Sequence, residues 1–212
     1  MATLDMHEQE QVDALKAWWK DNGKSLMLAI VLGVGIFGAV LGWKYWHAKQ
    51  NAEAATLFGE VMKQVGSNDP KRVNDAAAAV VSKYGSTMYA SRAELLAAQV
   101  NIQVKDSATA ASQLQWVIDH AAEASLQDVA RLKLASLRLD EKKYDDALKL
   151  LDAAHPEAFN GLYVDLKGDV LSAQGKTEEA RAAYKLALDK TDAKSSYRNL
   201  IQMKLDALGG AK

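Results

Sequence analysis

Residues 33–38, GVGIFG, have the G-x-G-x-x-G spacing of a loop that binds the pyrophosphate of a dinucleotide. Such a loop needs a β-strand before its glycines and a helix after them, because the strand-to-helix turn presents backbone N–H groups to the phosphates. Here the glycines lie inside an uncharged stretch from Ser25 to Trp43, so no separate strand precedes them. We therefore expect no nucleotide site at these glycines.

A second phosphate-binding pattern is incomplete. Gly23-Lys24-Ser25 has the last residues of a P-loop, but that loop requires a glycine five positions before Gly23, where this chain has Trp18. We interpret Gly23 instead as the C-cap of a helix and Ser25 as the start of the next helix.

The remaining reactive residue types show no catalytic or metal-binding pattern. None of the four histidines has a partner at the spacing that forms a metal pair on a helix, and the chain has no cysteine. Adjacent carboxylates such as Asp145-Asp146 open predicted helices, where they complement the helix dipole. We therefore expect that the protein is not an enzyme and uses no cofactor, metal or small-molecule substrate.

The charge of the chain also excludes one class of partner. With 26 Lys and Arg against 27 Asp and Glu, the formal net charge is -1. No long-range field draws such a chain to a polyanion, so we expect no nucleic-acid partner.

The uncharged stretch predicts a transmembrane helix that contacts the lipid bilayer. A helix from Ser25 to Trp43 would span roughly 28 Å, close to a hydrocarbon core of about 30 Å. Lys24 and Lys44 bracket it. Trp and Tyr prefer the membrane–water interface, and we expect the following residues to anchor the two ends there: Trp18, Trp19, Trp43, Tyr45 and Trp46.

Two alternatives to a membrane anchor fit less well. A buried core helix seldom lacks a polar face over such a length, and a cleavable signal peptide has a shorter apolar region, a basic leader and an A-x-A-like cleavage site. We predict three parts: a cytoplasmic leader over residues 1–24, an uncleaved transmembrane signal anchor over 25–46, and a helical-repeat domain over 47–212.

Three glycines in the predicted anchor share one helix face. Gly35, Gly38 and Gly42 recur at spacings that align on a helix. Small residues let two transmembrane helices approach closely, so this face is a candidate docking surface for another transmembrane helix. The alternative is that glycine is simply frequent in such helices.

The carboxyl-terminal part predicts an all-α fold without a sheet. Apolar residues keep helical period from Ala54 to Val65, and Asp69-Pro70 has the pattern of an N-cap followed by proline at N1. Helices are then expected at about 70–84, 87–104, 107–120, 125–141, 144–154, 158–174, 177–190 and 194–208.

These helix pairs fit the packing pattern of a tetratricopeptide repeat, so the predicted fold is an α-solenoid of that type. Small residues let paired helices approach, and a glycine allows the turn between them. The best match is residues 161–188, and weaker ones precede it by 33 residues and then by 37. We predict these repeat-packing residues: Gly168, Leu171, Gly175, Ala180, Tyr184 and Ala187, with Ala135, Ala147 and Leu151 in the preceding repeat. A plain helical bundle is the alternative.

The concave face of such a solenoid binds peptides or protein segments. The slots that line it predict a partly apolar groove, although the leucines among them have packing against neighbouring repeats as an alternative. The candidate groove residues are Leu162, Asp165, Asp169 and Ser172 in the last repeat, and Leu132, Ser136 and Leu139 in the preceding one.

The chain resembles the YfgM-like proteins, ancillary subunits of the Sec translocon. The resemblance covers nearly the whole chain, and the leader and anchor are its most specific part. It rests on the segments QVDALKAWWKDNGK, VLGVGIFGAVLGWKYW, DLKGDVLSAQGKTEEARAAYKLAL and QMKLDAL.

The resemblance implies a single-pass protein of the bacterial inner membrane, with a cytoplasmic N-terminus and a periplasmic repeat domain. It implies association with a SecYEG-type translocon and a membrane-anchored periplasmic chaperone of the peptidyl-prolyl isomerase type. The implied role is to link emerging secretory proteins to periplasmic chaperones. A general envelope scaffold unrelated to the translocon is the alternative.

Overall fold

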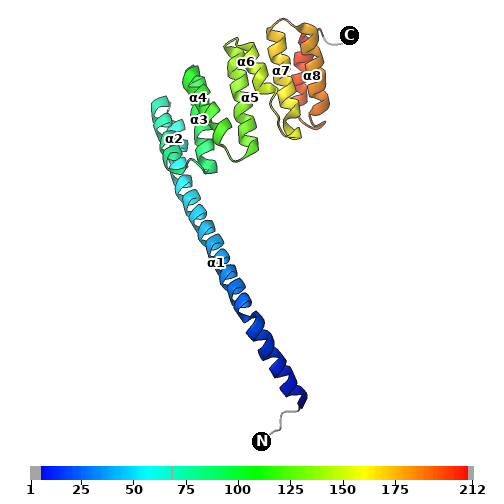
Figure 1. Ribbon diagram of the computed structural model, residues 1–212. Coiled ribbons are helices and arrows are strands. Elements are labelled where there is room, and N and C mark those ends of the chain that lie inside the picture. The colour runs from blue at the N-terminus through cyan, green and yellow to red at the C-terminus, as the bar shows by residue number, and fades with distance from the viewer. Residues whose placement is uncertain (1–5, 68, 210–212) are drawn as a thin grey trace. The chain divides into compact units, whose positions relative to one another are not determined.

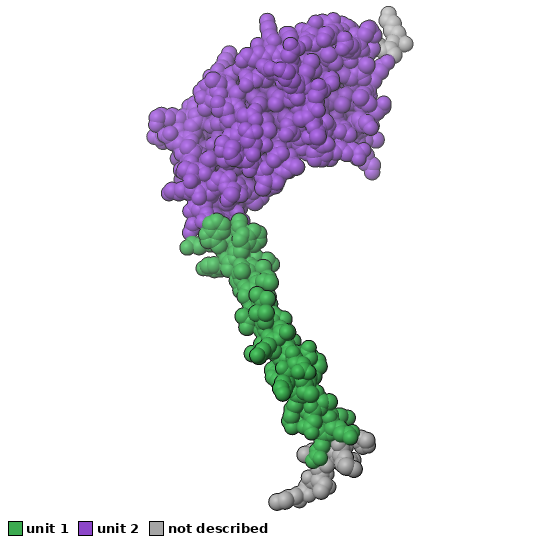
Figure 2. Space-filling view, viewed as in Figure 1, with its two compact units in different colours: residues 1–49 green, residues 50–212 purple. Residues whose placement is uncertain are grey.

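The computed structural model describes residues 6–67 and 69–209, and this part of the chain is helical without a strand (Figure 1). The all-α prediction is thereby confirmed. The chain divides into two compact units, one up to Lys49 and one from Gln50 onward (Figure 2).

The first unit consists of most of α1 (Met6–Val65), a single helix of 60 residues. One window of this helix is apolar and long enough to cross a membrane, with a mean hydropathy of 2.4 and no part of it buried. The expected helix break at Gly23 is wrong, because α1 continues through this residue. Gly23 packs under the Trp19 ring, and the cost of about 1 kcal/mol for a glycine inside a helix is tolerated there.

The second unit begins with the end of α1 and continues as antiparallel helix pairs that stand side by side (Figure 1). Helix α2 starts as expected, because Asp69 Oδ1 accepts a hydrogen bond from the Lys71 backbone N–H at 3.0 Å and Pro70 occupies the first turn. The elements are α2 (Pro70–Tyr84), α3 (Met88–Gln103), α4 (Ser107–His120), α5 (Ala124–Asp140), α6 (Tyr144–Leu151), the 3₁₀ turn η1 (Glu157–Phe159), α7 (Asn160–Ala173), α8 (Thr177–Lys190) and α9 (Tyr197–Ala207).

Two predicted helices are shorter by three residues at one end in the structure. Helix α6 ends at Leu151 rather than 154, and in the segment that follows, His155 Nδ1 lies 2.7 Å from the Ala153 carbonyl oxygen. Helix α9 begins at Tyr197 rather than 194, because the Asp192 carboxylate accepts the Lys194 backbone N–H at 2.7 Å and forms a turn there.

Three turns with the same backbone conformation mark the repeats. Lys105, Lys142 and Gly175 link α3 to α4, α5 to α6 and α7 to α8, with φ of 65°, 60° and 77°. In each turn the residue that follows donates its backbone N–H to a carbonyl five positions earlier, at 2.8 to 2.9 Å. This is the C-cap that ends a helix with a left-handed residue. The three helix pairs are therefore structural repeats with matching turns.

The odd-numbered helices form one layer of the solenoid. Helix α3 contacts α5, and α5 contacts α7. The end of α1 joins this layer through Phe58, whose ring centroid lies 5.7 Å from that of Tyr89 on α3. Helix α9 joins the other end, where Lys204 Nζ donates to Asp165 Oδ2 of α7 at 2.8 Å. In a tetratricopeptide solenoid the first helix of each pair lines the concave face, which is the odd-numbered layer here.

Candidate interaction surfaces

The glycine face of α1, formed by Gly35, Gly38 and Gly42, contacts no other part of the chain that the structure describes. A Cβ atom placed on Gly35, Gly38 or Gly42 would meet nothing within 4 Å. The five aromatic residues expected at the interfaces are likewise exposed: Trp18, Trp19, Trp43, Tyr45 and Trp46. The apolar side chains and the glycine face of this helix are therefore accessible.

The predicted repeat-packing residues lie in the core of the second unit. The Tyr184 ring covers Gly168, and a Cβ atom added there would lie 2.6 Å from Tyr184 Cε1. Six more of the predicted residues are buried: Leu171, Ala180 and Ala187 in the last repeat, and Ala135, Ala147 and Leu151 in the preceding one. Gly175 lies outside the core, in the α7–α8 turn, where its positive φ favours glycine.

The candidate groove residues of the middle repeat do not form one free surface. Leu132 and Leu139 pack against a core cluster that includes Ala135 and Tyr163, so the alternative of packing between repeats describes them better. Ser136 is exposed.

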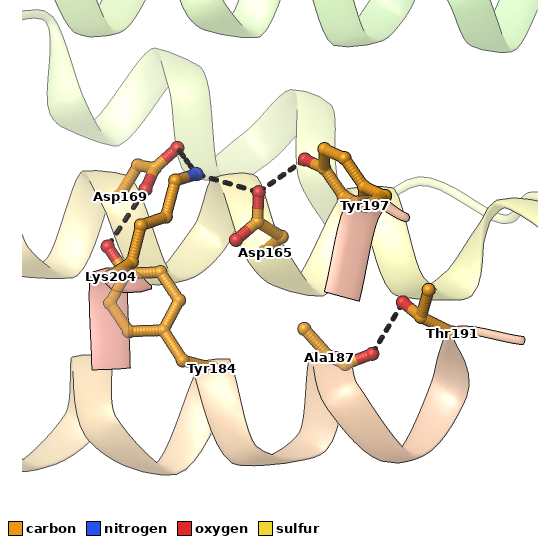
Figure 3. A network of polar contacts seen from close by, with 7 residues as sticks. All are labelled: Asp165, Asp169, Tyr184, Ala187, Thr191, Tyr197 and Lys204. Atoms are coloured by element: carbon orange, nitrogen blue, oxygen red, sulfur yellow. Dashed lines mark hydrogen bonds and ion pairs between the residues drawn. The ribbon is translucent and has the colours of Figure 1, made fainter. Parts of the chain in front are cut away.

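In the last repeat, Asp165 is a wrong prediction as a groove residue. It is 1% exposed, because Tyr197 and Lys204 of α9 cover it. Figure 3 shows the arrangement: Asp165 Oδ2 accepts from the Tyr197 hydroxyl at 2.5 Å and from Lys204 Nζ at 2.8 Å. The charged pair thus fixes α9 to α7 and closes this end of the layer.

Asp169 belongs to the same network rather than to an open groove. Its carboxylate accepts from Lys204 Nζ at 2.7 Å and from the Tyr184 hydroxyl at 2.8 Å (Figure 3). Leu162 and Ser172 stay partly accessible on either side. The concave face therefore has little open surface at its C-terminal end.

The network raises the pKa values of Tyr184, Tyr197 and Lys204. Burial, followed by the hydrogen bond to Asp165, raises the pKa of Tyr197, and burial with the bond to Asp169 raises that of Tyr184. Burial would lower the pKa of Lys204, but the hydrogen bonds to both aspartates outweigh it and the pKa is raised. Lys204 is thus held as a cation between two carboxylates, and this interaction joins α9 to α7.

A second buried network joins α5 to α7 and was not expected from the sequence. The Tyr163 hydroxyl and Arg131 both donate to Asp128 Oδ1, at 2.8 and 2.6 Å. His155 stacks on the Tyr163 ring with centroids 3.7 Å apart. These contacts hold neighbouring repeats together. No cluster of three or more His, Asp or Glu able to bind a metal ion occurs in residues 6–67 and 69–209.

The structure also contains a hollow that the sequence analysis missed, here named the N-terminal groove. It is open to solvent, has a volume of about 420 Å³ and lies within the second unit. Three of its residues, Arg92, Leu95 and Gln99, occupy in the first repeat the same slots that predicted a groove in the later repeats. This correspondence of slots is the sequence signal for the groove. The lining is Phe58 and Met62 of α1, Arg92, Leu95, Leu96 and Gln99 of α3, and Lys133 of α5.

Comparison with known proteins agrees with this architecture. The family model described as a tetratricopeptide repeat-like domain matches residues 16–210. A protein of Neisseria gonorrhoeae named ancillary SecYEG translocon subunit is 32% identical over 205 residues, covering 96% of this chain and 98% of the relative. A protein of Escherichia coli with the same name is 31% identical, covering 95% and 97%. One of Aggregatibacter actinomycetemcomitans is 28% identical, covering 96% and 98%.

The similarity extends over the apolar helix and the repeats together, as the coverage of both chains shows. The predicted tetratricopeptide-like fold and the predicted family are both confirmed by it. The chain belongs to the family of proteins named ancillary SecYEG translocon subunit.

Proposed function

We propose that the protein is a single-pass subunit of the bacterial inner membrane that associates with a SecYEG-type translocon and acts there as an adaptor without catalysis. The observation that carries this proposal is similarity over nearly the full length to several relatives that share the translocon name. A partial match to the repeats alone would support much less, since helical repeats serve many functions.

The finer role is to link emerging secretory proteins to a membrane-anchored periplasmic chaperone of the peptidyl-prolyl isomerase type. Its support is an apolar helix able to cross a membrane together with a solenoid, a fold that binds protein segments. Anchoring a solenoid beside a channel raises the local concentration of its partners, up to roughly millimolar for a short tether.

Affinity purification of the tagged full chain from gently solubilised membranes tests both levels, with mass spectrometry of the recovered proteins. Stoichiometric recovery of SecY-type channel subunits is expected, together with a membrane-bound isomerase-type chaperone. Recovery of the channel without the chaperone would remove the finer role. Recovery of cell-wall or outer-membrane assembly proteins in place of the channel would favour a general envelope scaffold.

The glycine face of α1 is the proposed contact with a partner's transmembrane helix. Gly35→Leu, Gly38→Leu and Gly42→Leu together are expected to lower channel recovery, because larger side chains separate the two helix backbones. Gly33→Leu is the matched control, since Gly33 also has open space around it but lies on the opposite side of the helix. Equal recovery with the triple variant and the control would show that this face makes no contact.

A further inference from the structure

We infer that the N-terminal groove, lined by Phe58, Met62, Leu95, Leu96, Arg92 and Lys133 with Gln99, is a docking site for an amphipathic protein segment that carries an acidic side chain beside its apolar residues. The occupant is a helix or extended strip of a partner protein. This inference is independent of which membrane complex the chain joins, since it rests on the surface of the repeat domain alone.

The apolar part of the groove is accessible to a partner. Leu95, Leu96 and Phe58 line it, and all three side chains are partly buried. Met62 borders the same hollow and is 54% exposed. A flexible thioether at the edge of an apolar groove adapts to side chains of different shape. The surface thus fits two or three large apolar side chains on one face of a segment.

The charges of the groove are of one sign. Arg92 and Lys133 line it, and none of the lining residues is a carboxylate. Lys133 Nζ donates to the neutral Gln99 side chain at 2.8 Å. Arg92 lies 3.8 Å from Glu123, a long separation between two side chains that are each about 40% exposed. An acidic side chain on the occupant would therefore find a cation with no carboxylate competing inside the groove.

At the other end of the same helical layer, the chain itself covers a residue of the concave face. There Lys204 and Tyr197 of α9 cover Asp165 with two hydrogen bonds, and the leucines of the middle repeat pack into the core. At the N-terminal groove Leu95, which occupies the repeat slot that Asp165 occupies in the last repeat, still borders open space. The N-terminal end of this layer therefore leaves apolar and cationic side chains accessible side by side.

A larger hollow of about 960 Å³ is a weaker candidate. Three of its charged side chains already interact with one another, since Glu141 accepts from Arg138 at 2.7 Å and lies 3.0 Å from Lys143 Nζ. A single lipid chain also fits the N-terminal groove less well than a protein segment does, since an open groove between helices leaves an acyl chain in contact with water.

The test measures binding of two fluorescent synthetic peptides to the full chain in lipid nanodiscs, with empty nanodiscs as background. Both peptides are helical, with leucine at i, i+3, i+4 and i+7, and they differ by Glu or Lys at the flanking positions. The protein is expected to bind the acidic peptide about fivefold more tightly than the basic one, in line with a partly exposed ion pair.

Two groove variants and one control give the result its specificity. Lys133→Glu is expected to reverse the preference, and the gain of affinity for the basic peptide shows at the same time that this variant is folded. Met62→Gln is expected to lower the affinity for both peptides, because it replaces an exposed apolar side chain of the groove by a polar one. Lys185→Glu, an exposed lysine of α8 away from the groove, is expected to change neither affinity.

Three outcomes would overturn the inference. The first is equal affinity of the unaltered protein for both peptides. The second is a preference that Lys133→Glu leaves unchanged. The third combines two results: neither peptide binds, and the protein retains a fluorescent anionic phospholipid that the Lys133→Glu variant does not retain. This outcome would identify the groove as a lipid site.

Discussion

The Tyr184 ring lies directly on the backbone of Gly168, so that a Cβ atom on residue 168 would be 2.6 Å from Tyr184 Cε1. The two residues belong to the two helices of the last repeat, α7 and α8. The Tyr184 hydroxyl also donates to Asp169 at 2.8 Å, which fixes the ring in this position. The closeness of α7 to α8 therefore depends on glycine at 168.

Gly168→Ala is expected to lower the free energy of unfolding by about 1–3 kcal/mol, the usual cost of forcing atoms into a packed core. Chemical denaturation of the full chain in detergent would measure the change. Gly59→Ala is the matched control: Gly59 lies in α1 with nothing within 4 Å, so alanine should be neutral or stabilise the helix there. Equal stability of both variants would contradict the close approach.

The turns between paired helices predict substitutions that raise the free energy of unfolding. Lys105 and Lys142 have φ of 65° and 60°, a left-handed conformation that costs a side-chain-bearing residue about 1–2 kcal/mol. Lys105→Gly and Lys142→Gly are therefore each expected to raise the free energy of unfolding by about 1 kcal/mol.

Two comparisons check that interpretation of the turns. Gly175→Ala should destabilise the protein, since Gly175 has φ of 77° in the equivalent turn. Lys185→Gly, in the middle of α8, should also destabilise by about 1 kcal/mol, because glycine is unfavourable inside a helix. Destabilisation by all four substitutions would show that the left-handed turns carry no strain.

Most helix bounds were predictable because their signals are local. The N-cap at Asp69, the glycine at Gly175 and the apolar period of α2 to α8 each depend on residues a few positions apart. The wrong helix break at Gly23 has the same origin: a local C-cap signal competes with a helix that continues on both sides.

The surfaces were less predictable because their residues are distant in sequence. Asp165 has the slot of a groove residue, but Lys204, which covers it, lies 39 positions later. The N-terminal groove likewise combines Phe58 of α1 with Leu96 of α3 and Lys133 of α5. Repeat slots identify which helix faces inward, and they do not identify which neighbour covers that face.

A buried carboxyl group on α3 predicts a dependence of stability on pH. Glu94 is buried, and this burial raises its pKa from 4.5 to about 7. Since the folded state holds the proton more tightly than the unfolded state, the contribution of Glu94 to stability is fully present below pH 4.5 and is lost as pH rises through about 7. The full loss would be about 3 kcal/mol.

Denaturant unfolding at pH 5 and pH 8 with Glu94→Gln would test this contribution. The variant should be more stable than the unaltered protein at pH 8 and should differ less at pH 5, because its side chain does not ionise. Glu157→Gln, at an exposed position, provides the control. A pH dependence that survives in the Glu94→Gln variant would assign it to another group.

The network at the C-terminal end predicts a second dependence, on the alkaline side. The pKa of Tyr197 is raised above 10.0 by burial and by its hydrogen bond to Asp165, so its contribution is present below pH 10 and is lost as pH rises above it. Unfolding measured from pH 8 to pH 11 should show a smaller decline for Tyr197→Phe. Tyr89→Phe, next to the Phe58 ring, serves as the control, and equal slopes would contradict the assignment.

The orientation of the chain in the membrane follows from the proposed function and is testable directly. The sequence contains no cysteine, so Asp13→Cys and Ser67→Cys each introduce a single reactive thiol, one on either side of the apolar stretch. A membrane-impermeant maleimide applied to intact spheroplasts should label the Ser67→Cys protein, since the repeat domain is proposed to be periplasmic. The Asp13→Cys protein should react after detergent permeabilisation, which also controls for thiol reactivity. Labelling of Asp13→Cys in intact spheroplasts would place the leader outside, and the repeat domain could then not meet periplasmic chaperones.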